Sequence, residues 1–165
     1  MTAPSDAPPP EPVAFARHNH RACIEGVLAA AEAACAERRA QLTPVRRRAL
    51  EILLEGHAAV GAYDLLQRLS AEGLGSGPPV AYRALNFLLA QGLAHRIESA
   101  DAFVACAHPG APHVPAFLVC RKCRAVAEGE AGPLEAGAEG FAVERRVVEA
   151  QGLCPRCRPG GEDEP

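Results

Sequence analysis

Apolar residues recur with a period of about 3.6 in four segments of the N-terminal half, with polar residues between them. An amphipathic helix is expected in each segment: 24–39, 43–56, 62–73 and 78–92. Thr43 and Pro44 suit the N-cap and the first position of the second helix. The inward faces are expected to consist of Val45, Leu50, Leu53 and Leu54, then Leu65, Leu66 and Leu69, then Leu85, Leu88 and Leu89.

Two short strand-like runs, 93–98 and 102–106, follow the last helix and are joined by a Ser-Ala-Asp turn. Several helices followed by a β-hairpin is the order of a winged helix-turn-helix. In that fold the helix before the hairpin, here 78–92, is the recognition helix that enters the major groove of DNA.

The composition changes after Cys106. Residues 107–116 include three prolines, which exclude a helix or a central strand and indicate a hinge. Beyond the hinge the pattern predicts strands over 116–120, 124–129 and 141–152, with a weakly helical stretch over 129–140.

Length and composition exclude several classes of protein. No apolar run among the 165 residues approaches the ~20 that a membrane helix needs. The Pro-rich, acidic N-terminus has neither the basic nor the apolar part of a signal peptide, so a cytoplasmic protein is expected. Seven cysteines in such a protein indicate metal ligands or redox thiols before structural disulfides.

The net charge of −3 divides unevenly along the chain. Residues 17–96 carry ten Arg against seven acidic residues, a net +3, whereas the remainder carries seven basic and thirteen acidic residues, a net −6. This split favours a nucleic-acid partner for the N-terminal part, although compositional drift gives the same pattern. Phosphate contacts are expected from three largely outward arginines of the second helix: Arg46, Arg47 and Arg48.

On the recognition helix, Arg83 and Asn86 lie opposite the leucine face. These are the side-chain types that pair bidentately with purine edges. The alternative is that both are solvated surface residues, and the hairpin that follows the helix favours DNA contact over it.

The strongest chemical signal is a pair of Cys-x2-Cys motifs: Cys120 with Cys123, and Cys154 with Cys157. Two such motifs supply four thiolates that can surround one zinc ion tetrahedrally. A redox Cys-x2-Cys normally occurs once and opens a helix, whereas both motifs here lie at strand ends. We expect a structural zinc site at these residues, called the four-cysteine site below, on which the C-terminal region depends for folding.

A looser group of metal-ligating residues consists of His95, Cys106, His108, His113 and Glu128. His95 and Cys106 lie on opposite arms of the expected hairpin and can face each other. One Cys, two His and one carboxylate make a competent tetrahedral set, in which the thiolate favours Zn²⁺ over Fe²⁺ or Mn²⁺. Spacing alone leaves purely structural roles for these histidines open.

A third candidate metal site consists of His18, His20 and Cys23, at the start of the first helix. Three ligand types within six residues favour metal binding. The exposed position and the lack of an evident fourth ligand weigh against it.

Taken together, these motifs resemble the ferric uptake regulator family, and within it the zinc uptake regulator subgroup. The resemblance spans about residues 24–158 and rests on LTPVRRRALEIL, AYDLL, PPVAYRALNFLLAQGLAHRIES and the two Cys-x2-Cys motifs. It implies an α+β homodimer with a winged helix-turn-helix domain (18–107) and a small αβ dimerisation domain that holds the four-cysteine zinc site (116–158). Composition places a hinge between them (108–115) and predicts disordered tails at the two ends (1–17 and 159–165).

The resemblance also implies roles for individual residues. The structural zinc ligands would be Cys120, Cys123, Cys154 and Cys157, and the regulatory zinc ligands His95, Cys106, His113 and Glu128. Tyr63 and Arg83 fall where family members contact bases, and Tyr82 falls where they contact the DNA backbone. The cofactor would then be two Zn²⁺ per monomer, or three if the group at His18 also binds.

The chain departs from the family in two informative places. Where iron-sensing members carry His-His-Asp-His, this chain has Pro-His-Val-Pro at 112–115, which argues against iron or peroxide sensing. The usual Thr-Val before Tyr-Arg is Val-Ala at 80–81, which is expected to remove a hydroxyl cap from the recognition helix.

The expected function is a zinc-responsive transcriptional repressor that binds an AT-rich palindromic operator as a zinc-loaded dimer and controls zinc-uptake genes. An iron- or peroxide-responsive regulator is the alternative within the family. An enzyme is not expected, because no open three-ligand site with a placed general base is visible, and neither a small-molecule substrate nor a membrane partner is expected. A zinc-ribbon interaction module without a DNA role is disfavoured by the face that carries Arg83 and Asn86.

Overall fold

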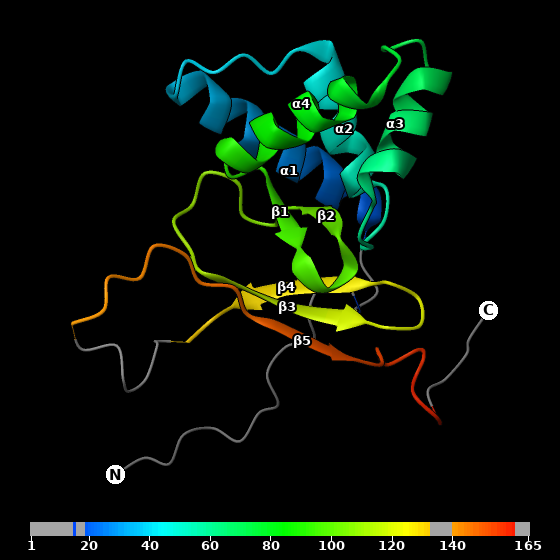
Figure 1. Ribbon diagram of the computed structural model, residues 1–165, viewed down its shortest axis with the longest axis vertical. Helices are drawn as coiled ribbons and strands as arrows, with labels where there is room; N and C mark the ends of the chain where they lie inside the picture. Colours follow the sequence, from blue (N-terminus) through cyan, green and yellow to red (C-terminus); the bar gives the residue numbers. More distant parts are fainter. Residues whose placement is uncertain (1–14, 16–18, 133–139, 161–165) are drawn as a thin grey trace.

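The computed structural model describes residue 15, residues 19–132 and residues 140–160. His18, most of the two expected tails and residues 133–139 of the expected helical stretch therefore lie outside the described residues. Figure 1 shows a helical region above a three-stranded sheet, with a β-hairpin between the two.

All four expected helices are present: α1 (His20–Glu37), α2 (Pro44–Leu54), α3 (Ala62–Ala71) and α4 (Pro78–Ala90). α1 begins before the expected Ile24 because Asn19 caps it, accepting a hydrogen bond from the N–H of Ala22 at 3.2 Å. Thr43 is the N-cap residue of α2 and Pro44 its first residue, as predicted, although the Thr43 hydroxyl makes no capping hydrogen bond. No helix in the described part of the chain is long and apolar enough to cross a membrane.

The expected position of the N-cap of α4 is wrong. α4 begins at Pro78, so Val80 lies inside the first turn, and the N-cap residue is Gly77. Gly77 has φ +92°, a conformation that favours glycine. The chain therefore enters the recognition helix through a glycine turn rather than through a capping side chain.

The helical core is built mainly from leucine, as predicted. The side chains without solvent exposure include Leu50, Leu65, Leu69, Leu88 and Leu93. Ala49, Ala81 and Ala84 are also buried, and their small size lets α2 and α4 pack closely. Leu66 and Leu89, expected in the core, are only partly buried at its edge.

The expected hairpin follows α4. β1 (Ala94–Ile97) and β2 (Ala102–Ala105) are antiparallel and are joined by a 3₁₀ turn over Glu98–Ala100. Asp101 closes the turn in the left-handed conformation, with φ 44°. Helices and hairpin together form the winged helix-turn-helix that the sequence predicts.

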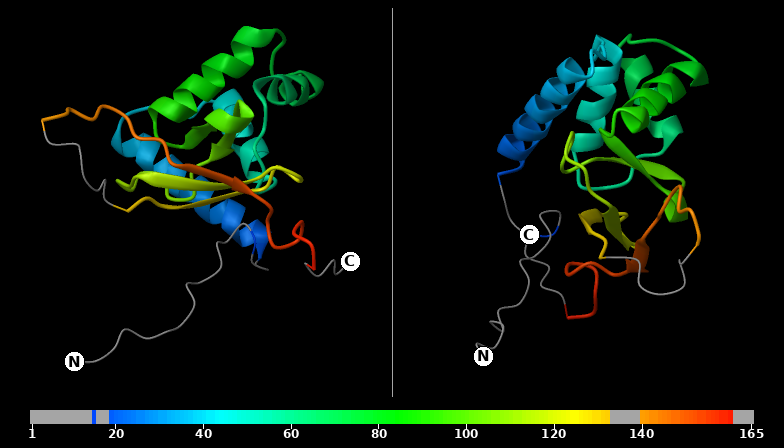
Figure 2. Two further views of the ribbon diagram at one scale, coloured as in Figure 1. Left: turned by 60° about the horizontal axis from the view of Figure 1, so that its bottom comes forward. Right: turned by 90° about the vertical axis from the view of Figure 1, so that its left-hand side faces the viewer.

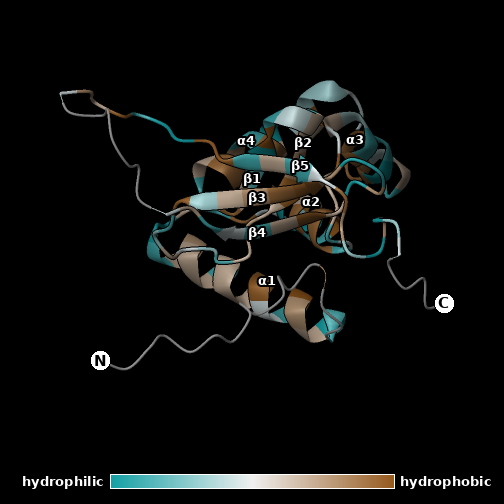
Figure 3. Cartoon of the chain, turned by 90° about the horizontal axis from the view of Figure 1, so that it is seen from below, coloured by the Kyte–Doolittle hydropathy of each residue, from teal (hydrophilic) through white to brown (hydrophobic). Residues whose placement is uncertain are grey.

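The C-terminal sheet contains β3 (Pro115–Cys120), β4 (Val126–Glu130) and β5 (Glu149–Gly152), in the order β4-β3-β5. β3 pairs antiparallel with β4 and parallel with β5. β3 carries the most hydrophobic residues of the three strands (Figure 3). It therefore forms the centre of the sheet in both topology and hydropathy.

Two sequence predictions fail in this sheet. The strand expected over 141–152 forms only from Glu149, where the chain first pairs with β3, and residues 141–148 are irregular. The helical stretch expected over 129–140 begins instead as the end of β4, and the described part of the C-terminal region contains no helix.

The helical region and the sheet share contacts through the loop after α2. Ala58 forms a β-bridge with Ala125 beside β4, and Val60 forms one with Phe103 in β2. A shared apolar cluster buries residues of the loop, the hairpin and the sheet: Ala59, Ile97, Ala102, Val104, Phe117, Val119 and Val126. Figure 2 shows the hairpin held between the helices and the sheet.

Glu149 adds a polar link between β5 and the hairpin. Its carboxylate accepts hydrogen bonds from the N–H groups of Glu98 at 2.7 Å and Ser99 at 3.0 Å. Burial raises the pKa of Glu149, but the hydrogen bonds from Ser99 and Glu98 outweigh this and lower the pKa. The link is therefore complete at neutral pH and weakens as the pH falls through this lowered pKa.

Replacing Glu149 by alanine should loosen the hairpin from the sheet. Loss of two charge-assisted hydrogen bonds in a partly exposed position should cost about 1 kcal/mol and speed local hydrogen exchange at Glu98 and Ser99 roughly fivefold. Glu144→Ala, which removes the same charge from the neighbouring irregular segment, is the control and should leave these amides unchanged. Equal exchange in both variants would contradict the assigned link.

Candidate metal centres and DNA-binding surface

The four cysteines expected to hold structural zinc meet at one end of the C-terminal sheet. Cys120 ends β3 and Cys154 follows β5, and because these strands are parallel the two Cys-x2-Cys turns lie together. The four Sγ atoms lie within 4.8 Å of one another, with Cys123 and Cys154 3.7 Å apart. None of the cysteines forms a disulfide, so the donor set fits tetrahedral zinc.

The ionisation of this cluster also favours a bound cation. Burial raises the pKa of the Cys120 thiol, but backbone hydrogen bonds from Cys123, Cys154 and Lys122 lower it to about 6. Burial and the neighbouring thiols raise the pKa of Cys157 to about 12. A bound zinc ion would compensate the charge that thiolates bring to this cluster.

The regulatory group meets at one point although its members come from different elements. His95 lies on β1, Cys106 follows β2, His113 lies before β3 and Glu128 lies on β4. Glu128 Oε1 is 3.3 Å from His95 Nε2, 2.8 Å from His113 Nε2 and 3.9 Å from Cys106 Sγ. His108 is outside this cluster, with its ring centroid 6.0 Å from that of His113.

Hydrogen bonds to the surrounding backbone orient the regulatory group. His113 Nδ1 lies 2.8 Å from the carbonyl oxygen of Ala111, so Nδ1 donates and Nε2 faces Glu128. Glu128 Oε2 accepts from the N–H of Ala107 at 2.8 Å. His95 Nε2 is buried and, although close to Glu128, makes no well-aligned hydrogen bond among the described residues. Such a nitrogen fits a metal ligand.

Burial and mutual electrostatic interactions shift the pKa values of three members of this group. Burial, and after it the charge of Glu128, raise the pKa of the Cys106 thiol to about 12. Burial lowers the pKa of His113, but the Ala111 carbonyl and Glu128 outweigh this and raise it. Burial raises the pKa of Glu128, but its interactions with His95, Ala107 and His113 lower it. One thiolate, two imidazoles and one carboxylate suit tetrahedral Zn²⁺, which would displace bound protons.

The third candidate site differs from the sequence prediction. His20 and Cys23 lie on the first turn of α1, and the third ligating side chain near them is His57, with the ligand atoms within 4.8 Å of one another. His18 lies outside the described residues. Sequence analysis missed His57 because it is 34 residues from Cys23 in a loop without a motif.

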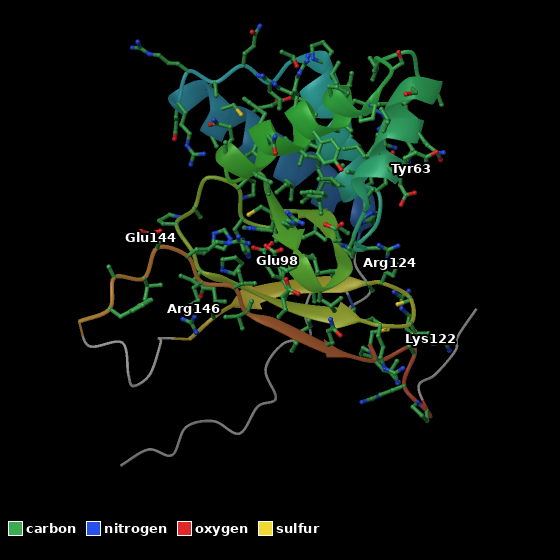
Figure 4. All side chains as sticks on the ribbon, viewed as in Figure 1. Tyr63, Glu98, Lys122, Arg124, Glu144 and Arg146 are labelled. Carbon is green, nitrogen blue, oxygen red and sulfur yellow. The ribbon has the colours of Figure 1, made fainter. Side chains whose placement is uncertain are left out.

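Four residues expected to contact DNA are exposed on α3 and α4. Tyr82, Arg83 and Asn86 are exposed on α4, on the side away from the buried core. Tyr63 lies at the start of α3, 69% exposed, and points outward in Figure 4. All four side chains are therefore accessible to a partner.

The three arginines of α2 are engaged within the domain instead of extending freely. Arg48 donates to Glu72 at 2.6 and 2.7 Å, to Glu55 at 3.0 Å and to Glu51 at 3.3 Å. Arg47 pairs with Glu32 and Glu51. Arg46 donates to the Gln41 carbonyl at 2.7 Å and lies 3.9 Å from the centre of the Phe87 ring. The expected phosphate contacts of these arginines stay a prediction.

Comparison with known proteins identifies the family. No family model matches the chain. The chain is 41% identical over 138 residues to the zinc uptake regulation protein of Escherichia coli (strain K12), covering 79% of this chain and 81% of that protein. The chain belongs to the zinc uptake regulators, a subgroup of the ferric uptake regulator family. Zinc uptake regulators are DNA-binding transcription regulators and not enzymes.

Solved structures of zinc uptake regulators have the same fold. A zinc uptake regulator complexed with zinc and DNA matches with a TM-score of 0.69 and 38% identity, over 79% of this chain and 92% of that chain. Holo XcZur matches with a TM-score of 0.67 and 38% identity, over 79% of this chain and 95% of that chain. Apo XcZur matches with a TM-score of 0.50 and 37% identity, over 82% of this chain and 98% of that chain. The predicted fold class is confirmed.

Replacing Cys123 by serine should remove one tightly held zinc ion per chain and unfold the C-terminal sheet, because structural zinc sites contribute folding free energy directly. Native mass spectrometry counts the zinc, and hydrogen exchange in β3 reports the folding. Cys35→Ala, which removes a buried thiol from α1, is the control and should keep the zinc. A full zinc complement in Cys123→Ser would contradict the assignment.

Proposed function

We propose that this chain is a zinc-responsive transcriptional repressor that binds operator DNA as a homodimer. The observation that carries the proposal is the convergence of His95, Cys106, His113 and Glu128 from the hairpin, the segment before β3 and the sheet. A zinc ion held by all four would fix the DNA-binding domain relative to the rest of the chain. The cofactor is then one structural and one regulatory Zn²⁺ per chain.

The similarity to the two forms of XcZur supports this mechanism. The sequence identities to the holo and apo structures are nearly equal, yet the TM-score is 0.67 for the holo form and 0.50 for the apo form. This chain is therefore more similar in structure to holo XcZur than to apo XcZur, which supports the proposal that its regulatory group binds metal.

Cys106 favours zinc over the iron- or peroxide-responsive alternative. Its thiol is fully buried beside His113 and Glu128, with Sγ 3.6 Å from His113 Nε2. A sulfur donor in a tetrahedral set suits Zn²⁺, whereas hard-ligand sites of nitrogen and oxygen suit Fe²⁺ or Mn²⁺.

The DNA-binding surface is assigned to Tyr63 and the outer face of α4. Arg83 and Asn86 would read base edges in the major groove, with Tyr63 beside them, and Tyr82 would contact the backbone. The solved relative that contains zinc and DNA supports this general mode of binding. Phosphate contacts from Arg46, Arg47 and Arg48 would require these side chains to exchange their present carboxylate or carbonyl partners for phosphate oxygens.

The dimer is assigned to the C-terminal sheet. Leu118 on β3 is exposed on the side opposite the core, and β5 has no further strand beside it among the described residues. Other exposed apolar side chains nearby are Phe141, Val143 and Val147. A second copy would cover this surface and place two recognition helices on two half-sites, so we expect a palindromic operator. We further expect that the operator is AT-rich, that it lies near zinc-uptake genes, and that the protein acts in the cytoplasm.

Replacing Cys106 by serine should abolish zinc-dependent DNA binding. A neutral hydroxyl is a poor zinc ligand, and the loss of one ligand should raise the zinc concentration needed for binding by about 100-fold or more. The probe is a genomic fragment retained by the zinc-loaded wild type, followed by fluorescence anisotropy at buffered free zinc. Unchanged zinc dependence in Cys106→Ser would defeat the proposal, and Cys35→Ala should behave like wild type.

Arg83→Ala should weaken binding to the same fragment by about 1–3 kcal/mol and relax its sequence preference, as loss of a bidentate base contact does. Arg48→Ala is the matched control: it should lower thermal stability through the loss of its pairs with Glu72 and Glu55, with little effect on DNA affinity. The reverse result, DNA binding lost in Arg48→Ala and kept in Arg83→Ala, would contradict the assigned surface.

A further inference from the structure

Three metal-ligating side chains outside the two zinc sites meet where α1 begins. His20 and Cys23 lie on its first turn, and His57 lies in the loop that follows α2. The rings of His20 and His57 are in edge contact, with centroids 4.9 Å apart and an interplanar angle of 61°. One ligand atom from each of the three residues lies within 4.8 Å of the others, and all three residues are half-buried.

A backbone hydrogen bond orients one of these ligands. His20 Nε2 lies 3.0 Å from the carbonyl oxygen of Glu55, and because a carbonyl only accepts, Nε2 carries the proton. This assigns the lone pair to Nδ1, the form in which an imidazole binds a metal. The bond has the same character as the one from His113 Nδ1 to Ala111 in the regulatory group.

We propose that His20, Cys23 and His57 form a third zinc site, distinct from the four-cysteine site and from the group around Glu128. One thiolate and two imidazoles are soft and borderline donors, which select Zn²⁺ over Mg²⁺, Ca²⁺ or Mn²⁺. Three protein ligands leave the fourth tetrahedral position to a water molecule. The site differs from the one suggested by local spacing, because its third ligand comes from the loop after α2.

The position of His57 connects the site to the junction of the two regions. The carbonyl of His57 accepts from the N–H of Val126 at 2.8 Å, and Ala58 bridges to Ala125. Val126 begins β4, the strand that also carries Glu128. A zinc ion on His57 would therefore tie the start of α1 to the strand that supplies the regulatory carboxylate.

The two groups also share one cavity of about 180 Å³. His20, Cys23 and His57 line it on one side, and Cys106 and Glu128 contribute to the same lining. Zinc at the third site would close the α1 side of this cavity and restrict motion next to the regulatory ligands. The site is thus placed to stabilise the arrangement that regulatory zinc requires.

Cobalt substitution tests the site in the full-length protein with the four-cysteine site kept filled by zinc. In the Cys106→Ser background, the thiols outside the four-cysteine site are Cys23 and the buried Cys35, and of these only Cys23 belongs to a ligand cluster. A sulfur-to-cobalt charge-transfer band from Cys23 is therefore expected when Co²⁺ is added. Adding His57→Ala should weaken Co²⁺ binding at least tenfold, and adding Cys23→Ser should remove the band. His108→Ala, a histidine of the same cavity outside the cluster, is the control and should retain it.

A direct count of zinc on the same series gives the second readout. Wild-type protein should retain three equivalents of Zn²⁺ after gel filtration, and His57→Ala and Cys23→Ser should each retain two with unchanged circular dichroism. Two equivalents in wild type, or a third that survives His57→Ala, would overturn the proposal. DNA binding enters neither readout, so failure here is distinguishable from failure of the repressor function.

Discussion

The carboxylate of Glu128 is the contact on which the relation between the two regions depends. It lies on β4 with its side chain 6% exposed, yet its partners belong to the hairpin and to the segment that leads from the hairpin to β3. A buried carboxylate costs free energy unless charges or hydrogen bonds compensate it. His95, His113 and the N–H of Ala107 provide that compensation, and they can do so only when hairpin and sheet lie as they do here.

Zinc would act on this arrangement by replacing protons. Burial and the charge of Glu128 raise the pKa of the Cys106 thiol to about 12, so zinc binding at Cys106 would displace a proton. A zinc ion that binds only the assembled group shifts the population toward the assembled state. Each tenfold excess of the free zinc concentration over the dissociation constant stabilises that state by about 1.4 kcal/mol. Because β1 begins four residues after α4 ends, a fixed His95 also fixes the recognition helix.

The sequence predicted the parts of this structure that local patterns determine. Apolar periodicity, carried by leucine in three segments and mainly by alanine in the first, located four helices, and the paired Cys-x2-Cys motifs located the four-cysteine site, because both signals lie within short stretches of chain. Spacing alone only suggested the regulatory group, since its ligands span four elements. The resemblance to the family identified the four ligands that the structure brings together and excluded His108.

Tertiary contacts decided what the sequence could not. His57 joins His20 and Cys23 only because the loop after α2 folds back to pair with β4. The pattern of charges along the sequence cannot show that Arg48 forms an ion pair with Glu72 at the end of α3. The strand expected over 141–152 shortens to four residues because a strand exists only where β3 lies beside it to pair.

Stepwise removal of zinc, with DNA binding followed on the same samples, tests the central claim most directly. A chelator of graded strength should first remove the zinc outside the four-cysteine site, and DNA affinity should fall with the zinc bound at His95, Cys106, His113 and Glu128 while the structural zinc stays. Full DNA binding by protein that retains only the structural zinc would contradict the claim that the regulatory ion sets the position of the recognition helix.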